Sequence, residues 1–391
     1  MRRVYLDNNA TTPVHPLVLE AMIPFFKETF GNASSVHYFG QQAKKALEES
    51  REKVAAFIGA KAGEIVFTSG GTESDNLAIK GVAYANRAKG RHIITSSIEH
   101  HAVLNVCKQL EKEGFEVTYL PVNRYGEVSP ESVEDAIRPD TILITVMHAN
   151  NEVGTLQPID AIGKIAKARQ ILFHTDAVQS VGKVPVNVDS FNVDLLSLSS
   201  HKIYGPKGVG ALYVRRGTRI LPLFQGGHHE RRRRAGTENV PGVVGLGRAC
   251  ELAAENMDEE AGKLLALMDR LQSGLERKVE DVLLNGHPTK RLPNTLNMSF
   301  AGVEGESLLL NLDMEGIAVS TGSACTSGTL EPSHVLSAMG VDPQLAQGSL
   351  RFSLGRENTE EDIDYVLAVI SDIVKRLRAI SPFYKSSSSP S

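Results

Sequence analysis

A lysine follows directly after a short apolar stretch of the sequence. Residues 195–208 run from leucines and serines into Ser200, His201 and Lys202, and then into a Gly-Pro turn. This order predicts a buried strand with Lys202 at its carboxyl end. Ligands bind at that edge of open α/β sheets, where a lysine amine can form an imine with an aldehyde cofactor. For Lys202 taken alone, a solvated surface lysine is the alternative.

A carboxylate occupies the same place after a second apolar stretch. Residues 171–175 lead into Asp176, and Gln179 follows. A negative group beside the nitrogen of a pyridine ring keeps the ring protonated, and a protonated ring withdraws electrons from a bound substrate. Together with Lys202, Asp176 therefore predicts pyridoxal 5′-phosphate (PLP) as the cofactor. A helix N-cap is the alternative for Asp176 by itself.

Two glycines and several hydroxyl side chains connect the strand predicted at residues 64–68 to a helix. Gly70, Gly71 and Thr72 lie at this junction. Backbone N–H groups at a helix N-terminus attract a phosphate, and glycine lets the phosphate approach the backbone closely. We interpret the junction as a phosphate cradle. A plain loop with a helix cap is the other interpretation.

One cysteine lies in a polar, glycine-rich segment. Residues 320–332 surround Cys325 with Ser, Thr, Gly and Ala, which is typical of an exposed loop. Since cysteine is usually buried, this placement predicts a reactive thiol, and a small residue in a tolerant loop is the alternative. Cys107 and Cys250 lie in helical patterns of apolar residues and are predicted to pack in the core. Three cysteines without CxxC spacing favour neither a disulfide framework nor a metal site.

Strands and helices must alternate to bring these residues together. Seven short apolar segments predict buried strands, at residues 64–68, 92–95, 117–120, 141–147, 171–175, 195–198 and 210–214. The segments between them, such as residues 41–58, have helical periodicity. Alternation of this kind predicts an α/β fold with a mainly parallel, seven-stranded sheet.

The pattern changes near residue 257. A long charged helix is expected over residues 257–280, followed by the separate strands and helices of a smaller α+β domain. We therefore expect a large domain at residues 15–256. The small domain, which carries Cys325, is expected to combine residues 1–14 and 257–384.

The composition is that of an ordinary globular protein. The net charge is −4, and 41% of the 391 residues are hydrophobic and 23% charged. No basic surplus favours a nucleic-acid or membrane partner. No signal peptide or bilayer-spanning segment is evident, which predicts a cytoplasmic location. The serine-rich residues 385–391 are too polar to bury and predict a disordered tail.

Taken together, these motifs resemble the fold-type-I PLP enzymes, and among them the cysteine desulfurases of the nitrogen-fixation and iron–sulfur-cluster type. Further matching motifs occur at residues 5–12, 31–35, 99–100, 148–152 and 349–356. The resemblance implies that sulfur is removed from L-cysteine to give L-alanine and a persulfide on Cys325. It also implies delivery of that sulfur to an iron–sulfur scaffold or another acceptor protein. Details of residues 215–239 favour the nitrogen-fixation branch.

The resemblance also implies roles for single residues. Lys202 would bind the cofactor and then move the substrate's α-proton, Cys325 would receive the sulfur, and His100 would stack on the ring and exchange protons with the thiols. The residues expected to hold PLP are Gly71, Thr72, His100, Asp176, Gln179, Ser199, His201, Lys202 and, from the neighbouring subunit of a homodimer, Thr237. The residues expected to bind the substrate carboxylate are Asn32, Asn151 and Arg351. Without the resemblance, Arg351 would be interpreted as a surface ion-pair residue.

Two features depart from the family pattern. Gly71 stands where relatives often have Ala or Cys, and residues 231–234 are four consecutive arginines. We interpret the arginines as a solvated face, and a docking patch for a partner is the alternative. Two other functions stay open. A PLP aminotransferase would share Lys202 and Asp176 but would not need an exposed thiol, and a non-catalytic sulfur carrier or scaffold would not need the cofactor set.

Overall fold

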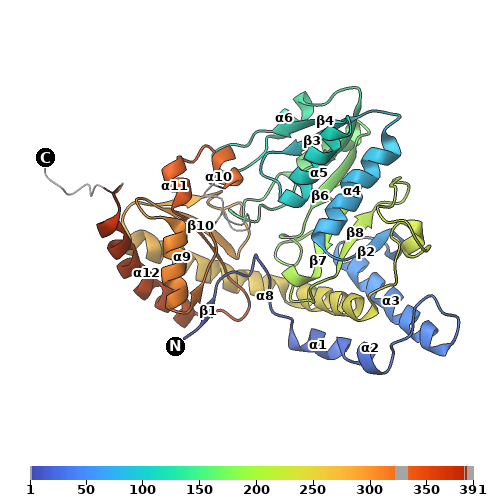
Figure 1. Cartoon of the computed structure of the whole chain (residues 1–391), viewed down its shortest axis with the longest axis horizontal. Coiled ribbons are helices and arrows are strands. Elements are labelled where there is room, and N and C mark those ends of the chain that lie inside the picture. The colour runs from blue at the N-terminus through green and yellow to red at the C-terminus, as the bar shows by residue number, and fades with distance from the viewer. Residues whose placement is uncertain (1, 322–332, 383, 385–391) are drawn as a thin grey trace.

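The computed structural model describes residues 2–321, 333–382 and 384, and its largest element is a seven-stranded sheet (Figure 1). The strands are β2 (Ile65–Thr68), β3 (His92–Ser96), β4 (Glu116–Leu120), β5 (Thr141–Thr145), β6 (Leu172–Asp176), β7 (Leu195–Ser199) and β8 (Gly210–Val214). Their order is β2-β8-β7-β6-β5-β3-β4, and only β8 runs antiparallel to its neighbours. All seven predicted strands are confirmed, as is the mainly parallel sheet.

Helices bury both faces of this sheet. One face packs against α4 (Gly71–Asn86) and α5 (His101–Lys112), and the other against α3 (Tyr38–Phe57), α7 (Ile159–Ala168) and the first part of α8 (Val240–Lys278). Successive residues of one strand point to opposite faces of the sheet. In β2, Val66 packs against α4 and α5, whereas Ile65 and Phe67 pack in the core on the other face. Strands buried on both faces are apolar throughout, and this is why the seven segments were recognisable in the sequence.

A second hydrophobic core lies around a three-stranded antiparallel sheet. The strands are β9 (Val282–Asn285), β10 (Thr295–Phe300) and β12 (Ser349–Ser353), in the order β12-β10-β9, with α9 (Gly305–Met314) and α12 (Glu360–Ile380) packed on them. The chain start joins this part, because β1 (Val4–Tyr5) pairs in parallel with β11 (Ile317–Ala318). The α+β character expected after residue 257 is therefore observed, and the domain limits themselves stay a prediction.

The helix expected over residues 257–280 is part of a longer one. α8 is continuous from Val240 to Lys278, 39 residues, and is about 58 Å long. The predicted start at residue 257 was wrong because the sequence becomes more polar there as the helix crosses between the two cores, without any break in the backbone. Asn239 marks the true start, since its side chain accepts the N–H of Gly242.

Short helices complete the described chain. They are α1 (Pro16–Met22), α2 (Pro24–Lys27), α6 (Pro130–Asp135), α10 (His334–Ala338) and α11 (Pro343–Gln347). Among the helices of the described residues, none has the length and apolarity needed to cross a membrane.

Candidate active site

Lys202 lies where the sequence predicts it, just beyond the carboxyl end of β7. It ends the short 3-10 helix η2 (Ser200–Lys202), and Tyr204 then adopts a left-handed φ of 62°. Nζ of Lys202 donates hydrogen bonds to the backbone carbonyls of Asn9 and Ala10, the second at 2.8 Å. The N-terminal segment therefore covers the lysine.

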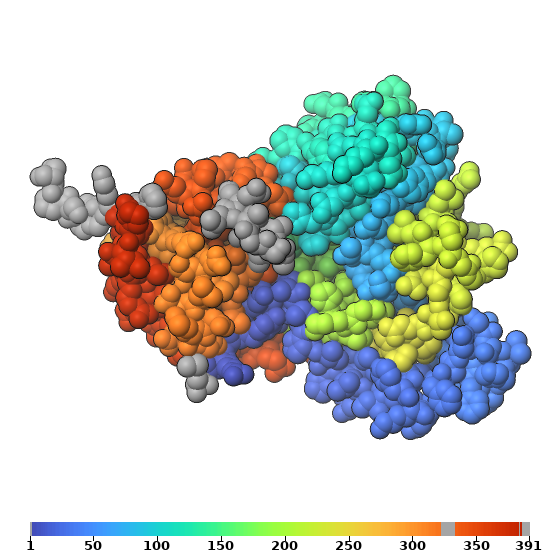
Figure 2. Space-filling view, viewed as in Figure 1, coloured from blue at the N-terminus to red at the C-terminus, as the bar shows by residue number. Residues whose placement is uncertain are grey.

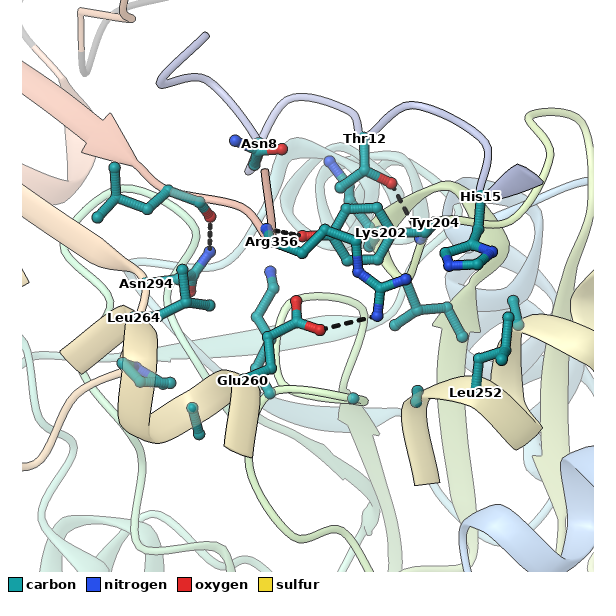
Figure 3. Close-up of a pocket in the computed structure, with 18 residues that line it drawn as sticks. Asn8, Thr12, His15, Lys202, Tyr204, Leu252, Glu260, Leu264, Asn294 and Arg356 are labelled. Atoms are coloured by element: carbon teal, nitrogen blue, oxygen red, sulfur yellow. Dashed lines mark hydrogen bonds and ion pairs between the residues drawn. The ribbon is translucent and has the colours of Figure 1, made fainter. Parts of the chain in front are cut away.

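A narrow cavity lies behind Lys202, between the N-terminal segment and α8 (Figure 3). Arg356 crosses it, with Nη2 3.0 Å from Oε2 of Glu260 and its backbone N–H bonded to the hydroxyl of Tyr204 at 2.8 Å. The guanidinium of Arg356 also lies over the Tyr204 ring, 4.6 Å from its centroid. These contacts hold the turn that follows Lys202 against α8.

Asp176 ends β6, the strand next to β7, and is buried. Burial raises the pKa of its carboxyl group to about 6, although the N–H of Val178 at 2.8 Å and the charge of Lys202 act in the opposite direction. A carboxylate enclosed in this way is suited to pair with a protonated ring nitrogen. The structure thus brings the predicted carboxylate and amine to adjacent strand ends.

A buried polar layer that the sequence analysis did not predict lies beside Asp176. Burial, followed by the negative charge of Asp176, holds the pKa of Asp75 well above its usual range. His174 bonds Oγ1 of Thr145 through Nδ1 at 2.8 Å and Oγ of Ser197 through Nε2 at 3.0 Å, and burial lowers its pKa to about 3. Burial therefore favours the uncharged forms of Asp75 and His174 beside the carboxylate of Asp176.

Gln179 reaches the same point of the N-terminal segment as Lys202. Its Nε2 donates to the carbonyl of Asn9 at 3.0 Å, and its Oε1 accepts a hydrogen bond from Nζ of Lys183 at 3.0 Å. Lys183 was not among the predicted site residues. The spacing of four between Gln179 and Lys183 was the one signal in the sequence that could have indicated the contact.

His100 caps the N-terminus of α5. Its Nδ1 accepts the N–H of Ala102 at 3.1 Å, so in the neutral ring the proton resides on Nε2. The residue is exposed, yet nearby protein atoms desolvate its imidazole, and this desolvation, followed by the charge of Lys202, lowers its pKa to about 4. His100 is therefore neutral near pH 7 and presents an N–H donor.

The residues of the predicted phosphate cradle lie at the N-terminus of α4. Among the described residues no side chain caps this helix at Gly70, so its first N–H groups are available to an anion. A Cβ on Gly71 would lie 2.7 Å from Cγ2 of Val178, so a larger residue here would require the Val178 side chain to shift. Thr72 is exposed beside them. An uncapped helix start beside Asp176 and Lys202 fits the phosphate, ring and aldehyde ends of PLP.

His201, another predicted phosphate ligand, also faces this region. Its Nδ1 lies 3.1 Å from Oγ1 of Thr11, and burial, followed by the charge of Lys202, lowers its pKa to about 4. Thr237 is exposed in the segment that precedes α8. Asn32 is likewise exposed, and its Oδ1 accepts the N–H of Ser34 at 2.9 Å.

Arg351 on β12 lies next to Asn151, as the predicted carboxylate site requires. Nη1 donates to the carbonyl of Asn151 at 3.0 Å, and Nη2 pairs with Oδ1 of Asp7 at 2.7 Å. The residue is buried, so the alternative of a surface ion pair was wrong. Within the described residues Nε of Arg351 has no hydrogen-bond partner, which leaves a buried donor for a ligand oxygen.

Cys325 lies outside the described residues. Cys107 on α5 and Cys250 on α8 are buried, which confirms the prediction that both pack in the core. Burial raises the pKa of the Cys107 thiol to about 12 and shifts that of Cys250 in the same direction. Since only a thiolate is nucleophilic, neither described cysteine is a suitable sulfur acceptor.

The four consecutive arginines do not form one face. Arg231 and Arg232 are exposed, whereas Arg234 is half-buried and pairs with Glu73 in the first turn of α4 at 2.9 Å. Just before them, Glu230 is buried and accepts two hydrogen bonds of 2.7 Å from Arg51. The solvated-face interpretation therefore holds only for the first two arginines.

Comparison with known proteins agrees with this geometry. The model of the aminotransferase class-V family matches residues 4–366. The cysteine desulfurase IscS of Dictyoglomus turgidum is 60% identical over 382 residues, 98% of this chain and 97% of its own. A solved structure of a NifS-like protein superposes with a TM-score of 0.91 at 44% identity, covering 96% of this chain and 100% of that one. The structure of SspA in complex with cysteine gives a TM-score of 0.80 at 41% identity, covering 90% and 98%.

The chain belongs to the aminotransferase class-V family, and the predicted fold is confirmed. Within this family it is a member of the cysteine desulfurases.

Proposed function

We propose that the protein removes sulfur from L-cysteine with PLP held on Lys202, passes the sulfur to Cys325 and releases L-alanine. The observation that carries the proposal is the placement of Lys202 and the buried Asp176 at the carboxyl ends of adjacent strands. PLP, when bound, supplies a sink for the electrons left at the substrate's Cα. Gly71, Thr72, Ser199, His201 and Thr237 would hold its phosphate, and Asp176, Gln179 and His100 its ring.

The chain's own residues would carry the proton and sulfur steps. Nζ of Lys202, held near the carbonyls of Asn9 and Ala10, is placed to take the Cα proton and later return one. The Cys325 thiolate attacks the substrate sulfur, so that an S–S bond forms as the bond from that sulfur to Cβ breaks. Cβ then gains a proton, which leaves alanine. His100, neutral with its proton on Nε2, would donate a hydrogen bond toward the reacting sulfur atoms.

Substrate orientation would come from Arg351 and Asn151, with Asn32 nearby. A guanidinium binds a carboxylate through two parallel hydrogen bonds. Nε of Arg351 is the donor without a described partner, and Nη2 could exchange Asp7 for the substrate.

We propose that the active unit is a homodimer in which Thr237 completes the phosphate site of the neighbouring subunit. A group of exposed apolar side chains between residues 17 and 39 supports a partner surface: Leu17, Leu19, Ile23, Phe26, Phe30, Val36, Tyr38 and Phe39. This segment, blue at the lower right of Figure 2, projects from the molecule. Such a concentration of apolar surface marks an interface.

Mixed dimers test the role of Thr237. Chains carrying Thr72→Ala and Thr237→Ala are given different affinity tags and purified as heterodimers. If Thr237 acts across the interface, one site keeps both threonines and the other loses both, and cofactor binding becomes biphasic. A single binding phase of intermediate affinity would contradict the proposal.

The released sulfur is proposed to serve iron–sulfur cluster assembly through a scaffold or other acceptor protein. A role in nitrogen fixation and a cytoplasmic location stay predictions.

The decisive experiment combines product analysis with mass spectrometry. Purified protein is incubated with L-cysteine, alanine is quantified, and the peptide that carries Cys325 is analysed. One added sulfur atom on Cys325, absent in Lys202→Ala, is expected, and Cys325→Ser should make no alanine above background. Amino transfer to a 2-oxo acid without persulfide would instead favour an aminotransferase. Lack of any cofactor absorbance that depends on Lys202 would favour a non-catalytic carrier.

A further inference from the structure

We propose that Lys183 is a positioning residue of the cofactor site, which fixes the side-chain amide of Gln179 so that its N–H group faces Lys202. The inference rests on the proposed function and deepens it.

Three hydrogen bonds define the arrangement. Nζ of Lys183 lies 3.0 Å from Oε1 of Gln179, and Nε2 of Gln179 lies 3.0 Å from the carbonyl oxygen of Asn9. The same carbonyl accepts a hydrogen bond from Nζ of Lys202. Lys183 and Lys202 are thus connected through one amide and one carbonyl group.

The donor inventory of lysine makes the orientation unambiguous. A glutamine amide has an acceptor at one end and donors at the other, and it can turn over if nothing distinguishes them. An ammonium group has donors only, so the end of Gln179 that faces Lys183 must be the oxygen. The carbonyl of Asn9 requires a donor at the opposite end. Both neighbours therefore specify the same orientation, with the N–H group toward the reactive lysine.

The location of Lys183 makes a purely structural role unfavourable. It lines the narrow cavity behind Lys202 together with Asn8, Asn294 and Glu260. The side chain as a whole is half-buried, but its amine end is enclosed by protein. Among the described residues no carboxylate lies within ion-pair distance of its Nζ. A buried amine without an ion-pair partner destabilises a fold, so packing alone does not account for it.

Only the ammonium form of Lys183 excludes a reversed amide of Gln179, but in the neutral form the carbonyl of Asn9 still specifies the same orientation. Burial, followed by the charges of Lys202 and Arg351, lowers its pKa to about 7, and Glu260 acts in the opposite direction. Both the protonated and the neutral amine carry N–H groups. The hydrogen bond to Gln179 is therefore available on either side of neutrality.

The consequence for the cofactor is electrostatic. The N–H group of Gln179 is expected to donate to the phenolic oxygen of PLP. A donor at that oxygen withdraws part of its negative charge and weakens its attraction for the proton on Nζ of Lys202. Among the described residues, the charge of Lys202 also acts on Asp176, His100 and His201. Loss of the fixed donor should raise the pH at which Nζ gives up its proton.

The test is a pH titration of the visible absorbance of the purified holoenzyme. Lys183→Met is expected to raise the midpoint by about one pH unit, the size of one lost hydrogen bond. If that variant does not fold, Lys183→Leu replaces it. Gln179→Leu is expected to shift the midpoint in the same direction. The double variant should then titrate like Gln179→Leu alone, because Lys183 acts through that amide.

Three results would overturn the proposal. The first is an unchanged midpoint in the Lys183 variant with only a lower melting temperature, which indicates a structural role. The second is a further upward shift when the Lys183 change is added to Gln179→Leu, which indicates that the lysine acts by its charge. The third is a downward shift in the single variant. Failure of the proposed function is distinguishable, since it would leave the unmodified protein without any titrating band that Lys202→Ala abolishes.

Discussion

The ring end and the phosphate end of the candidate cofactor site are built in different ways. At the ring end, Asp176 lies beside Asp75 and His174, and all three side chains are buried in the core around the sheet. At the phosphate end, Thr72 and Thr237 are exposed, and the helix start offers backbone N–H groups only. The ring end is thus built by a single folded chain, whereas the phosphate end is proposed to need a second subunit. We expect changes at the ring end to alter chemistry and changes at the phosphate end to alter affinity.

The largest effect is expected for Asp176→Asn. Removing the charge beside the ring nitrogen should lower kcat about 10²- to 10³-fold, the range seen when a preorganised electrostatic partner is lost. Asp75→Asn is the matched control. Because burial raises the pKa of Asp75 and so favours its neutral form, its replacement by a neutral amide should change kcat less than about twofold. Steady-state alanine production measures kcat for both variants. An equal decrease in kcat would mean that Asp176 and Asp75 share one function.

The support of the phosphate end is tested by Glu230→Ala. This change takes the buried carboxylate away from Arg51, which keeps only the more exposed Glu48 at 3.3 Å as an ion-pair partner. It also removes the acceptor for the N–H of Phe67, on the strand that leads to the predicted cradle. The free energy of unfolding should fall by about 3–5 kcal/mol. The exposed neighbour Arg231→Ala should change it by about 0.5 kcal/mol or less. Urea denaturation measures the free energy of unfolding of both variants. A small effect of Glu230→Ala would mean that other contacts hold the segment around residue 230.

A pH effect is expected at Glu152, beside the substrate residue Asn151. Burial raises the pKa of its carboxyl group to about 7, and Ser333 donates to Oε2 at 2.5 Å. Because the folded-state pKa lies above the unfolded one, the stabilisation is complete below about pH 4.5 and is lost as pH rises through about 7. The stability of the unmodified protein relative to Glu152→Gln should therefore decline by about 2–3 kcal/mol over that interval. Denaturation curves of both proteins at pH 5 and pH 8 measure this difference in stability. If the difference is the same at both pH values, the prediction is wrong.

The smallest effect is expected at the phosphate end itself. Thr72→Ala should weaken PLP binding about tenfold, the equivalent of one hydrogen bond to a charged group, with kcat unchanged when the cofactor saturates. The exposed Thr289, far from the site in the chain, provides the matched control as Thr289→Ala. Cofactor titration followed by absorbance separates affinity from rate. A reduced kcat at saturation would erase the contrast between the two ends.

The parts predicted from the sequence are those specified by local pattern. Each buried strand of the large sheet is an apolar run, and Lys202 and Asp176 were recognisable because each directly follows one. Asp75 could not be assigned a role, since its neighbours Asp176 and His174 come from a distant strand. The start of α8 was predicted at residue 257 because the composition becomes more polar there. Asn239, a residue type that favours helix N-caps, was the signal in the sequence for the true start. The position of Cys325 relative to Lys202 stays a prediction.

The continuity of α8 has a consequence for how the protein melts. Its first half contributes Val243, Leu246 and Ala249 to one hydrophobic core, and its second half contributes Leu267 and Leu271 to the other. If either core unfolds, it loses its contacts with α8, and α8 also packs in the other core. Despite its size, the described part of the chain should therefore lose its structure in one cooperative calorimetric transition, and a proteolytic cut near residue 258 should split that transition in two.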